Sequence, residues 1–125
     1  MSLQLQHEAR ALHNAELYNA LDSKKFPDWS VVALFYQGVH LIESILDTEG
    51  EHSESHQDRN KNMNNHIELF PKDLKNDYRQ LERLSMQARY RPEFGITDEN
   101  LNVAFQCIET IKYWHKEIKK KISVK

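Results

Sequence analysis

The chain has 125 residues, 39% of them hydrophobic and 29% charged, with a formal net charge of -2 at pH 7. This length predicts a single domain over residues 1–125, because it can bury one core but not two independent ones. Only three glycines and three prolines are present, which favours helices and disfavours an all-β fold. The near-neutral charge excludes a globally basic surface for nucleic acid or anionic membrane, so a phosphate-binding surface must be local.

The first predicted helix covers residues 5–21, where apolar residues recur at steps of three and four. The residues expected on its inward face are Leu5, Ala9, Leu12, Ala15, Tyr18 and Leu21. Phe26 and Pro27 interrupt the pattern, and Asp28 or Ser30 is expected to cap the next helix.

The second predicted helix, residues 31–46, is the most hydrophobic segment and should be the central, most buried element. Gly38 in its middle costs about 1 kcal/mol relative to alanine, which predicts a close helix crossing there. Glu49 and Gly50 are expected to end this helix. The polar segment that follows, up to Asn65, has no sustained period and predicts a loop, with at most a helical turn.

Two further helices complete the predicted fold. Pro71 is placed to begin the third, which should end near Tyr90 because Pro92 follows. Thr97 is a good N-cap for the fourth. The inward stripes of the two helices are expected at Leu74, Tyr78, Leu81 and Leu84, and at Leu101, Phe105, Ile108, Ile111, His115, Ile118 and Ile122. The pattern predicts an all-α, up-and-down four-helix bundle.

The single cysteine, Cys107, excludes an intrachain disulfide and is typical of a reducing compartment. Because it lies beside the apolar stripe of the last helix, we expect an inert packing residue. Residues 1–10 lack the basic flank and apolar run of a secretory leader, and no uncharged stretch of about 18 residues is present. We therefore expect a cytoplasmic protein that does not contact a membrane.

The polar segment between Asp47 and His66 concentrates ionisable groups, and its only apolar residue is Met63. Arginine suits phosphate or carboxylate, and histidine titrates near neutrality, so Arg59 and His66 together could bind a phosphate and move a proton. The composition makes such a spacing expected about once by chance. A solvated loop is therefore the alternative interpretation.

Tyr36, His40 and Glu43 form a polar stripe on the otherwise apolar second helix. Buried polar groups need partners, and the expected ones are His56 and Arg59. The alternative is that Glu43 only fixes helix register by accepting a hydrogen bond. No His-x-x-x-His pair lies on one predicted helix, and we expect neither a metal nor a cofactor.

A third group of candidate site residues lies at the end of the third predicted helix, where Ala88, Arg89 and Tyr90 precede Arg91 and Pro92. An arginine at a carboxyl-terminal helix end is favoured by the helix dipole, so Arg89 could simply cap the helix. No glycine-rich phosphate loop, Gly-x-Ser-x-Gly elbow or Cys-x-x-Cys pair occurs in the chain.

The order of these elements resembles the HEPN family of small prokaryotic helical domains. A long apolar second helix ends at a glycine, His56 follows, and the Ala88, Arg89, Tyr90 and Pro92 cluster precedes the last helix. The resemblance implies a four-helix bundle, homodimerisation, and either nucleotide-associated binding or metal-independent RNA cleavage. Arg59, Asn60 and His66 match the spacing of the cleaving motif, but the fourth predicted helix, where many cleaving members carry it, has no arginine.

The leading hypothesis is a HEPN-like domain that binds a nucleotide or RNA phosphate. Its expected ligand-binding residues are His40, His56, Arg59, Asn60 and Arg89. Tyr36, Glu43 and Tyr90 are expected to support them. The alternatives are a toxin-like endoribonuclease that uses Arg59 and His66, and a purely structural module for dimerisation or partner-protein docking.

Overall fold

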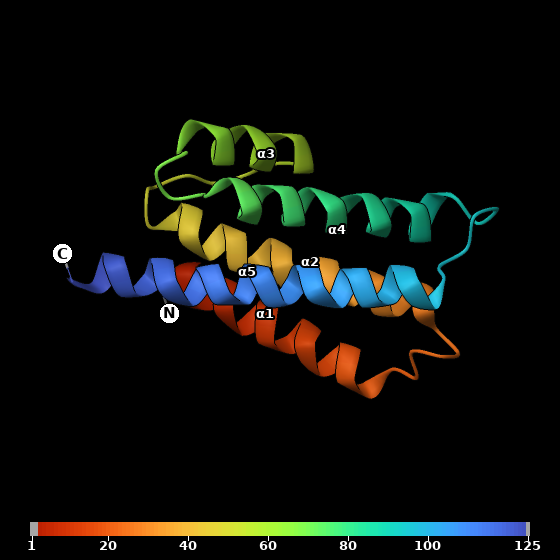
Figure 1. Ribbon diagram of the computed structural model, residues 1–125. Helices are drawn as coiled ribbons and strands as arrows, with labels where there is room; N and C mark the ends of the chain where they lie inside the picture. Colours follow the sequence, from red (N-terminus) through yellow and green to blue (C-terminus); the bar gives the residue numbers. More distant parts are fainter. Residues whose placement is uncertain (1–2, 125) are drawn as a thin grey trace.

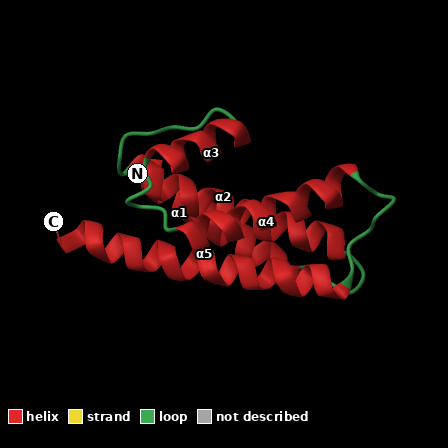
Figure 2. Cartoon of the chain, turned by 45° about the horizontal axis from the view of Figure 1, so that its top comes forward, coloured by secondary structure: helices red, strands yellow, loops and turns green. Residues whose placement is uncertain are grey.

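The computed structural model describes residues 3–124, with the side chains of residues 3–122, and this part of the chain contains no β-strand. The fold is therefore all-α, as expected. Its helices are α1 (Leu3–Ala20), α2 (Pro27–Asp47), α3 (His56–Asn65), α4 (Lys72–Tyr90) and α5 (Asp98–Val124), shown in Figure 1. Four of them correspond to the expected long helices. The short helix α3 lies on their outer side (Figures 1 and 2).

Helix α2 is the centre of the core, as predicted. It packs against α1, α4 and α5, and most of its residues from Ser30 to Leu46 are buried. By length and composition α2 could cross a membrane, but 78% of its apolar window is buried inside the domain. That burial is typical of the core helix of a soluble domain, since protein already covers its apolar surface.

Helix α1 turns only part of the predicted face inward, since Ala15, Tyr18 and Leu21 are half-buried but Leu5, Ala9 and Leu12 are exposed. Leu5 and Leu12 are 52% and 62% exposed, whereas Ala11 is buried and His7 and Tyr18 are half-buried. The prediction was wrong for Leu5, Ala9 and Leu12, because apolar spacing identifies a helix face without showing which side meets the core. The small side chain of Ala11 instead lies against the core, and His7 finds a polar partner on α2.

The ends of the helices follow local chemistry. The Thr97 hydroxyl accepts a hydrogen bond from the Asn100 amide at 3.0 Å, which confirms the predicted cap of α5. Helix α4 ends at Tyr90, as predicted. The caps predicted for α2 were wrong, because α2 begins at Pro27 without a side-chain cap. Proline at the first helical position lacks one N–H and has a helix-compatible φ, so it starts the helix without a capping side chain.

The predicted loop between α2 and α4 contains the ten-residue helix α3. Ser55 caps it by accepting a hydrogen bond from the Asp58 amide at 3.0 Å. The side chains that α3 buries are those of Arg59 and Met63. A search for apolar periodicity misses such a helix, since one of its two buried positions is occupied by a charged residue.

At Gly38, side chains of α4 and α5 approach the α2 backbone closely, in agreement with the predicted crossing. A Cβ atom at this position would lie 3.2 Å from Ile111 Cδ1, 3.5 Å from Leu81 Cδ2 and 3.6 Å from Ile108 Cδ1. The missing side chain therefore lets three branched residues pack onto the α2 backbone. This close packing offsets the low helix propensity of glycine.

We predict that Gly38→Leu destabilises the fold by roughly 1 to 3 kcal/mol or more, because the core has no room for the added atoms. Gly38→Ala is the matched control. It should change stability by less than about 1 kcal/mol, since the tight contact with Ile111 is opposed by a gain of helix propensity. Urea unfolding of both variants measures the difference, and equal stabilities would contradict the packing described.

Candidate functional site

A buried ion pair joins α3 to α2. Arg59 is 7% exposed, and its Nε donates to Glu43 Oε1 at 2.8 Å. Its Nη1 also donates to the hydroxyl of Tyr78 on α4, at 3.2 Å. Burial by itself would lower the pKa of Arg59, but Tyr78 and Glu43 outweigh this effect and raise it. Arg59 is therefore a permanent cation, and it connects three helices through Glu43 and Tyr78.

His56 lies beside this pair in a defined protonation state. Arg59 Nη1 is 2.7 Å from His56 Nδ1, and a guanidinium can only donate, so His56 Nδ1 accepts. Burial and the nearby Arg59 lower the pKa of His56. The imidazole is consequently neutral at pH 7 and carries its proton on Nε2. Its ring also packs against Phe35 and Tyr36, with centroid distances of 5.3 and 6.2 Å.

Arg89 also contacts Tyr36, and aromatic rings surround its guanidinium. Its Nη1 donates to the Tyr36 hydroxyl at 3.1 Å, and its Nε donates to the Ser85 carbonyl at 3.3 Å. The guanidinium carbon lies 5.1 Å from the ring centroid of Tyr90 and within 6 Å of those of Phe35 and Tyr36. These contacts fix the cation while leaving Nη2 without a hydrogen bond to the described residues.

Beside Arg89 is a groove of about 310 Å³ between the start of α2 and the end of α4. Asp28, Trp29 and Val32 line one side, and Ala88, Arg89 and Tyr90 line the other. Trp29 and Tyr90 are 57% and 65% exposed, so two large rings and one guanidinium border an accessible groove. Sequence reasoning missed Trp29 and Asp28 as groove residues, because the helix was predicted to start at residue 31, four residues after its actual start at Pro27.

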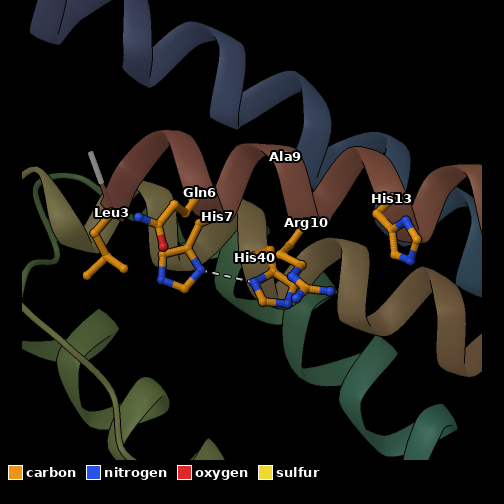
Figure 3. A pocket seen from close by; sticks show the side chains of 7 residues that line it. All are labelled: Leu3, Gln6, His7, Ala9, Arg10, His13 and His40. Atoms are coloured by element: carbon orange, nitrogen blue, oxygen red, sulfur yellow. Dashed lines mark hydrogen bonds between the residues drawn. The ribbon is translucent and has the colours of Figure 1, made fainter. Parts of the chain in front are cut away.

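His40 was expected to lie with His56 and Arg59, but the structure places it on the other side of α2. Its Nδ1 lies 3.0 Å from Nδ1 of His7 on α1, and the two rings face each other across the contact between α1 and α2 (Figure 3). Burial, followed by the charges of His7 and Arg59, lowers the pKa of His40 to about 4. The polar stripe of α2 therefore divides, with Glu43 and Tyr36 on the α3 and α4 side and His40 on the α1 side.

His66 lies at the carboxyl-terminal end of α3, whereas His56 is the first residue of this helix. His66 Nε2 is 3.2 Å from Glu51 Oε1, and its Nδ1 is 3.6 Å from Glu68 Oε1. The hydrogen bond to Glu51 raises the pKa of His66. His66 follows Arg59 by seven positions and caps the end of α3, so the two backbones are about 10 Å apart along the helix axis. Arg59 and His66 share none of these partners within the described chain, and their catalytic roles stay a prediction.

Asn60, the polar residue after Arg59, also faces α4. Its Nδ2 donates to Glu82 Oε1 at 3.2 Å, while its buried Oδ1 has no hydrogen-bond partner among the described residues. Asn60 therefore links α3 to α4 within the domain, and its ligand-binding role stays a prediction.

A serine, a histidine and a glutamate also meet elsewhere, between α2, α5 and α1. The same His115 nitrogen, Nε2, is 2.8 Å from Ser44 Oγ and 3.3 Å from Glu8 Oε2. A nucleophilic triad needs the base to use opposite ring nitrogens, and its serine must be accessible, whereas Ser44 is fully buried. Cys107 is also buried, which raises its pKa to about 11 and agrees with an inert packing residue.

Residues 3–124 contain no group of three or more His, Cys, Asp or Glu side chains arranged to hold a metal ion. The chain matches no protein-family model, and no curated protein or solved structure shows significant similarity to it.

We predict that Arg59→Ala destabilises the domain by roughly 3 to 5 kcal/mol, because it leaves the Glu43 carboxylate buried without its cation. An Arg59→Met, Glu43→Gln double variant should recover part of this loss, since it removes both charges. Lys61→Ala, an exposed change on the same helix, is the control and should stay within about 0.5 kcal/mol of the wild type. Urea unfolding measures all three, and a loss below about 1 kcal/mol for Arg59→Ala would contradict the pairing.

We also predict that the free energy of unfolding falls as the pH is lowered from 7 to 5. The pKa values of His7, His40, His56 and His115 lie below 6.5 in the folded chain. The unfolded chain therefore binds more protons below about pH 6.5, and stability declines through a window that for His40 extends to about pH 4. His66 has the opposite sign, because its raised pKa adds stability that is lost as the pH rises.

Urea unfolding at pH 7 and pH 5 tests this dependence. The loss should be smaller in His40→Asn than in the wild type, since the variant has no imidazole to titrate at this position. Equal losses in the two proteins would show that His40 does not contribute.

Proposed function

We propose that this chain is a cytoplasmic, homodimeric HEPN-like domain that binds a nucleotide or an RNA phosphate. In this proposal the long helices form an up-and-down four-helix bundle to which α3 is added. Arg89 binds the phosphate beside His56, and Trp29 and Tyr90 offer ring surfaces to the base. The observation that carries the proposal is the groove of about 310 Å³ in which Arg89 meets these two exposed rings.

The environment of Arg89 suits phosphate recognition. A guanidinium binds phosphate through planar, charge-assisted hydrogen bonds, and its affinity is greater when its orientation is fixed in advance. The Tyr36 hydroxyl and the surrounding rings provide that orientation. His56 is close enough for Arg89 to lower its pKa, and the Nε2 proton of the neutral ring adds a second donor.

The exposed rings of Trp29 and Tyr90 favour a nucleotide over a bare anion. Stacking on an aromatic side chain contributes about 1 to 3 kcal/mol per base and tolerates any base. The Asp28 carboxylate, which lines the same groove, would repel a phosphate but can accept hydrogen bonds from ribose hydroxyls. In this proposal the phosphate therefore binds to Arg89 and the sugar binds to Asp28.

Arg59 has a positioning role in this proposal. Its side chain is almost fully buried and already bound to Glu43, Tyr78 and His56, so it holds the His56 ring against Phe35 and Tyr36. The ribonuclease alternative would need Arg59 or His66 to leave these partners or to act across two chains. No contact among the described residues favours it.

Titration with AMP, UMP, adenosine and a short oligoribonucleotide, followed by calorimetry, tests the proposed function. Arg89→Gln should weaken binding of the nucleotides about tenfold or more, because a charge-assisted hydrogen bond is lost. Tyr90→Ala should weaken binding about five- to hundredfold through lost stacking, and its exposed ring makes a folding defect improbable as a cause. Light scattering of the same samples measures the proposed dimer.

Arg83→Gln is the control for charge, since Arg83 is an exposed arginine on α4 that does not line the groove. It should bind nucleotides like the wild type. No heat above background for any nucleotide, or equal binding by wild type and Arg89→Gln, would contradict the proposal. Oligonucleotide products ending in 2',3'-cyclic phosphate would instead support the ribonuclease alternative.

A further inference from the structure

A second pocket, separate from the Arg89 groove, opens between α1 and α2 (Figure 3). It has a volume of about 560 Å³. Its ionisable lining residues are His7, Arg10 and His13 on α1 and His40 on α2, and its other lining residues carry no charge. A pocket with several basic groups and no carboxylate on its wall attracts anions.

Arg10 provides the permanent charge of this pocket. It is exposed, and within the described residues its guanidinium forms no ion pair and no hydrogen bond. The positive charge of Arg10 is also near enough to lower the pKa of His40. Arg10 and His40 line the same pocket (Figure 3), so an anion held by Arg10 would also face the imidazole.

His7 and His40 can add positive charge to the pocket by taking up a proton. Their Nδ1 atoms are 3.0 Å apart, so one ring donates and the other accepts, and this contact is lost when both rings are protonated. Burial is the largest cause of the lowered pKa of each ring. Both rings are thus largely neutral at pH 7 when the pocket is empty, and an anion would favour their protonated forms.

The charges that act on this pair lie on α1, α2 and α3 and in the segment between α2 and α3. Glu43 on α2 raises the pKa of both histidines, and Asp47 raises that of His7. Arg59 on α3 lowers both, and His52 lowers that of His7. Burial lowers the pKa of each ring more than any one of these charges changes it. A ligand that brings negative charge from the open side of the pocket would raise both pKa values again.

We propose that this pocket binds a phosphate-type dianion, held by Arg10 together with His13 and His40. Protonation of a histidine accompanies binding, and the proton comes from solvent. A dianion fits better than a monocarboxylate, because Arg10 and one imidazolium supply two positive charges. The site does not use Arg89 or His56, so the inference is independent of the proposed nucleotide site and goes beyond it.

Calorimetric titration of the full chain with sulfate at low ionic strength tests this inference. Sulfate keeps two charges between pH 6 and pH 8, so any pH dependence of binding must come from the protein. We expect binding at pH 6 that weakens at least tenfold by pH 8. Repeating the titration in two buffers with different ionisation enthalpies should show the uptake of close to one proton.

Two variants connect the binding to this pocket. Arg10→Gln should weaken sulfate binding at least tenfold at pH 6, and His40→Asn should reduce the proton uptake. His66→Asn is the control, since His66 lies outside the pocket and is not among the groups that shift the pKa of His7 or His40. The NMR ring signals of His7, His13 and His40 should shift when sulfate is added, and that of His66 should not.

Titration with phosphate esters then tests whether the pocket prefers a dianion to a monoanion. Ribose 5-phosphate should bind like sulfate, whereas dimethyl phosphate and acetate, which carry one charge, should bind at least tenfold more weakly. Affinity that is independent of pH, or unchanged by Arg10→Gln, would overturn the inference. Dimethyl phosphate binding as well as sulfate would also overturn it, because the pocket would then not select a dianion.

Discussion

The buried charge of Arg59 constrains much of this structure. Helix α3 is otherwise polar, and besides Met63 it buries no apolar side chain. A helix of ten residues is marginal by itself, so its position depends on tertiary contacts. Glu43 compensates the buried charge, Tyr78 satisfies a further donor, and both are supplied by the core helices. A desolvated cation without these partners would cost several kcal/mol, which makes α3 dependent on Glu43.

This constraint also determines which polar groups lie together. Arg59 orients His56 toward Tyr36, and Tyr36 in turn binds Arg89 at the edge of the groove that contains Trp29 and Tyr90. The remaining histidine of the α2 stripe, His40, lies on the opposite side with α1. The domain consequently has two separate polar sites, a groove where Arg89 meets exposed aromatic rings and a pocket with histidines that can take up protons.

The sequence predicted the features that local rules determine, such as the buried stripe Leu74 to Leu84 and the Thr97 cap. It also predicted the contact between Glu43 and Arg59, since a polar stripe on a buried helix must find partners. It failed for α1, where leucines at helical spacing face solvent and Ala11 faces the core. It failed for α3 because an ion pair, rather than apolar periodicity, holds that helix. The groove beside Trp29 depends on how α2 and α4 meet, which no local pattern reveals.

Hydrogen exchange of the amides of α3 in Glu43→Gln tests most directly whether compensation of the Arg59 charge holds this helix. The substitution keeps the size and an acceptor oxygen of the side chain and removes only its charge. We expect the amides of residues 59–65 to exchange at least tenfold faster than in the wild type, while those of α4 and α5 keep their protection. Unchanged protection in α3 would contradict the central role assigned to the ion pair.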